Sequence, residues 1–472
     1  MTAGSTSSLR HCSPLATSHF LVSHEMKKYV APHETASDYR LKLALLGAAV
    51  VVLMGCSDTG DERVLITPNQ RLGEVVAELR GAFEKAIDKP VPSLNVLIQT
   101  PEGTYFSSST ASGIEPVTPT TYFRFASITK PFTATAIMKM HQDGWLDYQD
   151  RMVDLIPGSD LPYVPDTPSW AIPYKNEITI RQLLQHNAGV YHVDQGPVPG
   201  CGDLGYTACM LEQDPDHQFT ATEIVEQAAF NQLSYFPPGT DNHHYSNTGY
   251  TILGEIIARV YTQHGDGEAK TYSDYLYDHV FGPSARVPLD LHFPYLAADQ
   301  TLPIPYVCGK IYWPEGAVED HCADNLSAQV AEGNGIGTML ALNQWVRTLY
   351  QGQNVLDLEH ADLMRMDTTS ANPNYGLGTS VAPNLGYGHN GARVGYLSQA
   401  TYDPDLDVSV VVIMAGGQKQ RALYERLWAE GVDAELSSQL RFMGCDEAQG
   451  YLYAPPLAAE DLEPWLRDRP QS

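Results

Sequence analysis

The chain has 472 residues, of which 43% are hydrophobic and 18% charged, a composition that fits a globular protein and excludes a largely disordered one. Its formal net charge of −27 excludes nucleic acid as a partner, because acidic side chains far outnumber the cations that would neutralise phosphates. The acidic residues are scattered along the chain, which indicates a solvated surface and does not identify a substrate.

The N-terminal segment predicts export. The apolar run LALLGAAVVVLM follows basic residues, and its length suits the core of a signal peptide better than a membrane-spanning helix. The run ends in LMGC, which resembles the lipobox of bacterial lipoproteins and implies cleavage before Cys56 and lipidation of its thiol. An uncleaved membrane anchor is the alternative. We assign residues 1–55 to a leader and signal peptide, of which 1–25 are not necessarily translated because Met26 makes an ordinary start.

The elements that follow mix helices and strands. Residues 56–65 predict a polar tether, and apolar positions at helical spacing predict a helix over 70–87. SLNVLIQT and TYFSSST flank the turn PEG as a hairpin, and PFTATAIMKMHQDG predicts an apolar helix closed by Gly144. A middle region, about 150–350, predicts a largely helical subdomain with loop insertions. The strands YLSQATYD and VSVVVIMAG follow, then the amphipathic helix RALYERLWAEGVDAEL and a C-terminal tail over 436–472.

Four cysteines predict two local disulfides. Cys201 and Cys209 lie eight positions apart, and Cys308 and Cys322 lie fourteen apart, in loop-like stretches rich in Gly, Pro and aromatic residues. In an oxidising compartment each pair would close its own loop. Zinc is the competing interpretation, but the spacings lack the CxxC form. Cys445 remains as a buried or free thiol.

The stretch FRFASITKPF places Ser127 three positions before Lys130. This spacing is nearly one helical turn, so both side chains lie on one face of a helix. A lysine kept neutral beside a serine can take the hydroxyl proton and create a nucleophile. Ser-x-x-Lys alone occurs by chance roughly once in a chain of this size, so its meaning depends on other motifs.

Two further motifs follow in a fixed order. The YSN triplet at 245–247 precedes a strongly apolar helix, and the HNG triplet at 389–391 leads into the returning strands. Ser-x-x-Lys, Tyr-x-Asn and a basic residue-x-Gly in this order resemble the serine β-lactamase and penicillin-binding protein superfamily. The branch most similar contains class C β-lactamases, D-aminopeptidases, DD-carboxypeptidases of the His-x-Gly type and family VIII esterases. The resemblance runs from about 70 to about 430 and includes SITKPFTATAIMKM, ITIRQLLQHNAGV and PGTDNHHYSNTGY.

The resemblance implies a role for each motif residue. Ser127 would attack a carbonyl carbon and form an acyl-enzyme, with favourable potential from the helix N-terminus. Burial would lower the pKa of Lys130 and make it a base. Tyr245 would exchange protons with Ser127 and the leaving group, and Asn247 would hold the polar side of the substrate.

The third motif bears on substrate binding. By resemblance, the backbone N–H groups of Ser127 and Ala392 would form the oxyanion hole, and Gly391 would leave room for substrate against its strand. Typical β-lactamases carry lysine where this chain has His389, a weaker and pH-dependent cation. This departure favours ester or D-amino-acid peptide substrates over β-lactams.

Two other interpretations of the motifs remain less favoured. Tyr174 begins a second Tyr-x-Asn triplet, but that triplet lacks the Pro-Gly-Thr turn and the apolar helix, so we interpret it as a surface loop. His243 and His244 suggest a metal site, but neighbours on an extended segment point in opposite directions and chelate poorly. We expect one to be packed, the other to line the cleft, and no metal or cofactor to be required.

The sequence therefore predicts an α/β (α+β) protein of the β-lactamase/transpeptidase type. We expect an antiparallel sheet flanked by helices, a largely helical second domain and a cleft between them, all within a serine hydrolase domain over 66–435. Expected partners are a small-molecule or peptide substrate and, through the lipid anchor, a bacterial membrane facing the periplasm or cell exterior. The alternatives are a true β-lactamase or DD-carboxypeptidase, a catalytically silent tethered binding or sensor protein, and a structural lipoprotein. Oligomeric state stays open.

Overall fold

The computed structural model describes residues 67–416, except 88, 203, 240, 266–267, 313–316 and 383–384. The predicted leader, Cys56, the predicted tether over 56–65, the closing amphipathic helix, Cys445 and the C-terminal tail lie outside these residues. Within the described residues, no helix combines the length and the apolar character that crossing a bilayer requires.

A six-stranded antiparallel sheet carries the fold, in the order β2-β1-β11-β10-β9-β8. The predicted hairpin is confirmed, with Thr100 opposite Gly103 across the turn, and the predicted C-terminal strands pair beside it. The strands are β1 (Ser93–Thr100), β2 (Gly103–Thr110), β8 (Ser380–Ala382), β9 (Gly386–Arg393), β10 (Tyr396–Asp403) and β11 (Val408–Ala415).

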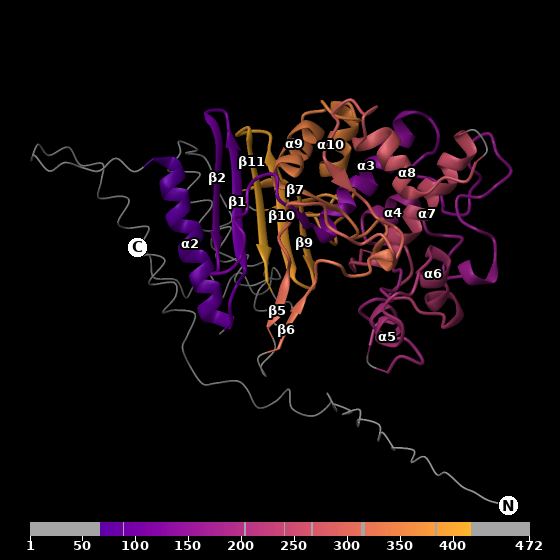
Figure 1. The fold of residues 1–472 in the computed structure, drawn as a ribbon. Coiled ribbons are helices and arrows are strands. Elements are labelled where there is room, and N and C mark those ends of the chain that lie inside the picture. Colours follow the sequence, from indigo (N-terminus) through magenta and orange to yellow (C-terminus); the bar gives the residue numbers. More distant parts are fainter. Residues whose placement is uncertain are drawn as a thin grey trace, which may run out of the picture. The chain divides into compact units, whose positions relative to one another are not determined.

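The central strands of the sheet, β1, β10 and β11, are buried on both faces. Helix α2 (Pro68–Ile87) packs along β2 and β1 (Figure 1), and its apolar residues form one core cluster with Leu94 of β1 and Val412 of β11. Successive strand residues point to opposite faces, so Leu97 and Val411 join the larger core on the other side. Burial on both faces explains the nearly continuous apolar sequence of β11, in which Ser409 is the polar exception.

Helices cover the second face and build the rest of the molecule. They are α3 (Thr129–Gln142), α4 (Ile180–Leu184), α5 (Tyr206–Gln213), α6 (Ala221–Phe230), α7 (Asn247–His264), α8 (Tyr272–Leu276), α9 (Met339–Tyr350) and α10 (Leu358–Met366). Short 3-10 turns lie at η2 (Ala126–Ile128), η3 (Pro168–Trp170) and η5 (Ser327–Gln329), with a π turn at η4 (Tyr277–Phe281). This arrangement of helices around an antiparallel sheet confirms the predicted fold class.

Two small sheets complete the described structure. One has the order β3-β7-β4, formed by Tyr122–Arg124, Ile336–Thr338 and Leu291–His292. The other pairs β5 (Lys310–Tyr312) with β6 (Val318–Asp320). β3 positions the site, because the chain passes from it directly into η2 and α3.

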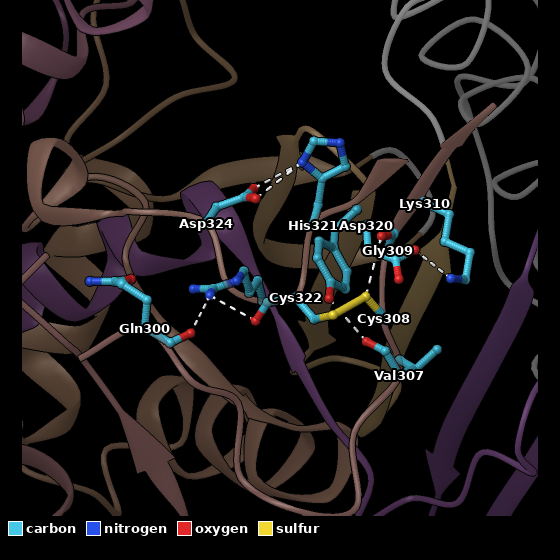
Figure 2. The surroundings of a disulfide bond; sticks show 11 residues. Gln300, Val307, Cys308, Gly309, Lys310, Asp320, His321, Cys322 and Asp324 are labelled. Atoms are coloured by element: carbon cyan, nitrogen blue, oxygen red, sulfur yellow. Dashed lines mark hydrogen bonds and ion pairs between the residues drawn. A yellow bond between two sulfur atoms is a disulfide. The ribbon is translucent and has the colours of Figure 1, made fainter. Parts of the chain in front are cut away.

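The structure holds two disulfides, Cys201–Cys209 and Cys308–Cys322, with Cα–Cα distances of 5.5 and 4.9 Å. Figure 2 shows the second, near an ion pair between Lys310 and Asp320. The carbonyl of Cys322 accepts a hydrogen bond from Arg124 at 3.0 Å. The second disulfide loop is thereby tied to the strand that leads into the Ser-x-x-Lys segment.

Candidate active site

Ser127 lies in the turn η2 between β3 and α3. Ala126, the residue before it, has φ 50°, a left-handed conformation that is uncommon outside glycine. The Phe125 amide donates to Gly335 at 3.1 Å, and its carbonyl accepts from the Ser398 hydroxyl at 2.9 Å. The backbone before Ser127 is therefore held from two sides. Ser127 is partly exposed while the residues on either side are buried, which leaves it accessible to a substrate.

Lys130 lies one turn further along and is 0% exposed. Its Nζ donates to Ser127 Oγ at 3.3 Å and to Asn247 Oδ1 at 2.8 Å. It also donates to the backbone carbonyl of Glu332 at 2.9 Å, and it lies 4.7 Å from the ring centroid of Tyr245. The structure thus brings the first two motifs together at one buried ammonium group.

Tyr245 and Asn247 flank Ser246, the N-cap residue of α7. The Ser246 hydroxyl caps this helix by accepting from the Gly249 amide at 3.3 Å. The Ser246 amide donates to Nδ1 of buried His186 at 3.1 Å, and the His186 ring lies 4.2 Å from that of Tyr245. The cap and the histidine therefore fix the backbone between the two motif side chains.

Strand β9 brings the third motif against the Ser127 turn. A Cβ on Gly391 would lie 2.2 Å from the Phe125 carbonyl and 2.3 Å from Ser398 Oγ, so only glycine fits this close approach. Ala392 is the next residue and is partly exposed. β8 pairs only with the first three residues of β9, and no other described strand covers that edge of 389–393. This edge, which we call open because no described strand pairs with it, lies beside the turn that carries Ser127.

His389 is buried and its ring has partners on both nitrogens. The Tyr375 hydroxyl lies 3.1 Å from Nε2, and Nδ1 meets the carbonyl of Asn390. A neutral ring protonated at Nδ1 satisfies both partners, because Nε2 then accepts from the tyrosine. Burial, with the nearby charge of Lys130, lowers the pKa of His389 to about 3. The ring is neutral at pH 7, unlike the pH-dependent cation expected from the sequence.

Two carboxyl groups that the sequence analysis did not identify flank Lys130. Glu332 is 2% exposed, and its Oε2 lies 3.4 Å from Lys130 Nζ. Burial raises the pKa of Glu332 to about 7, and the lysine opposes that rise. Asp194 interacts with the Asn247 side chain and accepts from Thr207 Oγ1 at 2.5 Å, and burial raises its pKa. Asn247 accordingly links the lysine to a second acid.

The first disulfide loop supports Asp194. Gly205 packs so closely that an added Cβ would lie 1.9 Å from the Asp194 carbonyl, and the Tyr206 amide donates to Val193 at 2.7 Å. No local motif marked Asp194 or Glu332. Glu332 contacts a lysine 202 positions away, so its role depends on the chain path and not on neighbouring residues.

The less favoured candidates lie in other settings. His243 Nε2 is 3.2 Å from the Asn372 side chain, whereas the His244 ring stacks on Tyr235 with centroids 3.5 Å apart. Tyr174 is 40% exposed and lines a shallow groove formed by 166–177 and Gln232. In the part of the chain that the structure describes, no three His, Cys, Asp or Glu side chains are grouped to hold a metal ion.

Sequence comparisons relate the chain to known proteins. A family model described as Beta-lactamase matches residues 79–432. Penicillin-binding protein 4* of Bacillus subtilis (strain 168) is 26% identical over 171 residues, which are 36% of this chain and 30% of that protein. Protein flp of Staphylococcus aureus (strain MW2) is 28% identical over 165 residues, 35% of this chain and 27% of that protein. The chain therefore spans less than a third of the length of these curated relatives.

Solved structures share the fold over a larger part of the chain. The D-amino acid amidase from Ochrobactrum anthropi SV3 has a TM-score of 0.57 at 23% identity, covering 76% of this chain and 99% of that one. A D-stereospecific amidohydrolase from Streptomyces sp. has a TM-score of 0.56 at 22% identity, covering 74% and 97%. The octameric penicillin-binding protein homologue from Pyrococcus abyssi has 0.56 at 19% identity, covering 80% of each chain.

Proposed function

The chain belongs to the Beta-lactamase family, and from that premise we propose that it is a serine hydrolase that forms an acyl-enzyme at Ser127. The observation that carries the proposal is the convergence on Lys130 Nζ of the Ser127 hydroxyl at 3.3 Å and the Asn247 amide oxygen at 2.8 Å. A buried amine in hydrogen-bond reach of a serine hydroxyl is the arrangement that activates this nucleophile.

The surrounding groups fit the chemistry of acyl transfer. Tyr245 lies over the lysine, where its hydroxyl can exchange a proton with the leaving group. The open edge of 389–393 offers backbone groups to a bound substrate, and the amides of Ser127 and Ala392 are the proposed donors to the oxyanion. The proposed nucleophile, base, proton-exchanging hydroxyl and oxyanion donors are all side-chain or backbone groups of this chain.

The proposed substrate is an ester or an amide built from a D-amino acid. A neutral His389 offers no cation to a substrate carboxylate, and the two acids beside Lys130 disfavour an anion there. Two of the solved structures with this fold are D-amino acid amidase and D-stereospecific amidohydrolase. A true β-lactamase or DD-carboxypeptidase would have to recognise a carboxylate at this position by other groups.

The experiment is labelling with a fluorophosphonate probe and with fluorescent penicillin, alongside turnover of p-nitrophenyl butyrate and D-phenylalanine p-nitroanilide. We expect fluorophosphonate labelling and turnover in the wild type and neither in Ser127→Ala. Ser370→Ala changes an exposed serine and serves as the matched control. An adduct on another residue, or full turnover by Ser127→Ala, contradicts the proposal. A folded wild type that neither reacts nor turns over favours the silent binding protein, whereas strong penicillin labelling favours the β-lactamase or carboxypeptidase alternative.

We also propose that Cys56 carries a lipid anchor on the exported protein. The support is the LMGC sequence after a short apolar run, which lies outside the described residues. Cys56→Ser should lose fatty-acid labelling and leave the membrane fraction or remain uncleaved, while Cys445→Ser should behave as the wild type. Unchanged labelling and fractionation of Cys56→Ser would exclude this anchor.

A further inference from the structure

The segment that carries Glu332 is fixed to the first turns of α3. The Thr129 hydroxyl accepts from the Gly335 amide at 3.0 Å, and the Thr133 hydroxyl donates to the Ala331 carbonyl at 2.6 Å. Both threonines are on the helix that bears Lys130, so the acid and the lysine are held by one rigid element. Their contact is preorganised and does not depend on a mobile loop.

The Glu332 carboxyl has a single described partner for its two oxygens. Oε2 lies 3.4 Å from Lys130 Nζ, whereas Oε1 is buried with no hydrogen-bond partner among the described residues. A permanently ionised carboxylate in this position would leave half of its accepting capacity unsatisfied, which is costly. A carboxyl that gains and loses a proton with its neighbour avoids part of that cost.

Resting on the function proposed above, we propose that Glu332 is a positioning residue that takes a proton from Lys130 and so makes its amine the base for Ser127. The carboxylate accepts the proton of the ammonium group, leaving a neutral amine. The amine lone pair takes the Ser127 Oγ proton while an Oγ lone pair bonds to the carbonyl carbon, whose π pair moves to oxygen. On collapse the leaving group departs with its bonding pair and receives the proton from Lys130.

The charges around the pair favour this exchange. The carboxyl of Asp194 lies near enough to raise the pKa of Glu332 further, whereas Arg393 lowers it. Two acids thus surround one buried amine, and a single proton shared between Glu332 and the amine is cheaper than full ionisation. The titratable groups that face this pair are Asp194, Arg393, His186, His389, Tyr245 and Tyr250.

A purely structural Glu332 is the rival interpretation. It would hold the lysine in place as a fixed ion pair, and its loss would lower activity by the same factor at every pH. If Glu332 instead accepts the proton of Lys130, the activity depends on pH. The active state holds one proton between the two groups, and it is lost when the pair binds a second proton. The activity then falls at acidic pH along a limb whose apparent pKa belongs to the pair of groups. Removal of the carboxyl shifts that apparent pKa.

The test is the pH dependence of kcat/KM for p-nitrophenyl butyrate, read at the isosbestic wavelength of the product, and of the rate at which a fluorophosphonate labels Ser127. In Glu332→Gln we expect about a 10- to 100-fold loss at pH 7, an acid limb moved to higher pH by roughly a unit or more, and recovery in alkaline buffer. Glu255→Gln is the matched control, since burial also raises the pKa of that glutamate on α7, away from the site.

An unmoved limb, or an equal loss at all pH values, would overturn the proposal. If Glu332→Gln does not fold, Glu332→Asp replaces it: a lower rate with a displaced limb is expected, and a profile superimposable on the wild type overturns the proposal. The Ser127→Ala variant distinguishes failure of the proposed hydrolase function from failure of the proposed role of Glu332. If turnover survives in Ser127→Ala, the proposed hydrolase mechanism is wrong. If Ser127→Ala loses turnover but the acid limb of Glu332→Gln is unchanged, only the proposed role of Glu332 is wrong.

Discussion

Both faces of the central strands of the six-stranded sheet are buried under apolar side chains, but the face away from α2 also borders the buried ionisable groups near Ser127. On the α2 face, Leu94 and Val412 share one apolar core cluster with residues of the helix and are 0% exposed. Near Ser127, the side chains of Lys130, Glu332 and His389 are at most 3% exposed, yet all can carry charge. Aliphatic burial stabilises almost wherever shape permits, whereas buried ionisable groups cost free energy unless partners are placed around them.

This difference between the two faces predicts different effects of mutation. On the α2 face a mutation should reduce stability and spare the chemistry, because no functional side chain lies there. Beside Ser127 a mutation should alter catalysis more than stability. The folded protein already bears much of the free-energy cost of burying these ionisable groups. Three experiments test this contrast.

The largest effect is expected at the catalytic pair. Lys130→Ala and Ser127→Ala should each lower kcat/KM for an activated ester by on the order of 10⁴-fold or more, and the double variant should be little worse, because the two groups act as a unit. Lys139→Ala is the control on the same helix, since Lys139 only pairs with Asp143 near the surface. Independent, multiplying losses in the double variant would mean that the lysine does not act through the serine.

A smaller effect, on stability alone, is expected for Leu94→Ala. Removing this buried side chain should lower the free energy of unfolding by about 2–5 kcal/mol in urea titrations, because a cavity forms against α2. The remaining folded enzyme should keep its kcat/KM within about twofold. Leu340→Ala, at a leucine 46% exposed on α9, is the control and should change stability by less than about 1 kcal/mol. A large loss of activity per folded molecule in Leu94→Ala would break the contrast between the faces.

The smallest effect concerns the pH dependence of stability. The folded-state pKa of His389, about 3, lies below its ordinary value of 6.5, so the unfolded chain takes up a proton as pH falls through 6.5 while the folded chain does not. This group therefore lowers stability from pH 6.5 toward 3, by up to about 1.4 kcal/mol per pH unit. His389→Gln should flatten the slope seen in urea titrations at a series of pH values. His292→Gln, at a half-exposed ring, is the control, and an unchanged slope in His389→Gln would contradict the buried, neutral state.

Local patterns determined much of the fold in advance. The PEG turn located the hairpin of β1 and β2, helical spacing located α2, and apolar sequences located α7 and β11. These signals are local because side-chain direction repeats every two residues in a strand and every 3.6 in a helix. The three ordered motifs likewise named Ser127, Lys130, Asn247 and Gly391, since each depends on only a few neighbouring positions.

The tertiary structure alone decided the electrostatic character of the site. Glu332 meets Lys130 from 202 positions away, and Asp194 reaches Asn247 from a loop held by the first disulfide. The sequence suggested a weak, pH-dependent cation at His389, but burial beside Lys130 lowers the pKa of its ring and keeps it neutral. A pKa depends on desolvation and on charges within a few ångströms in space, and neither quantity is encoded by the residues adjacent in the chain.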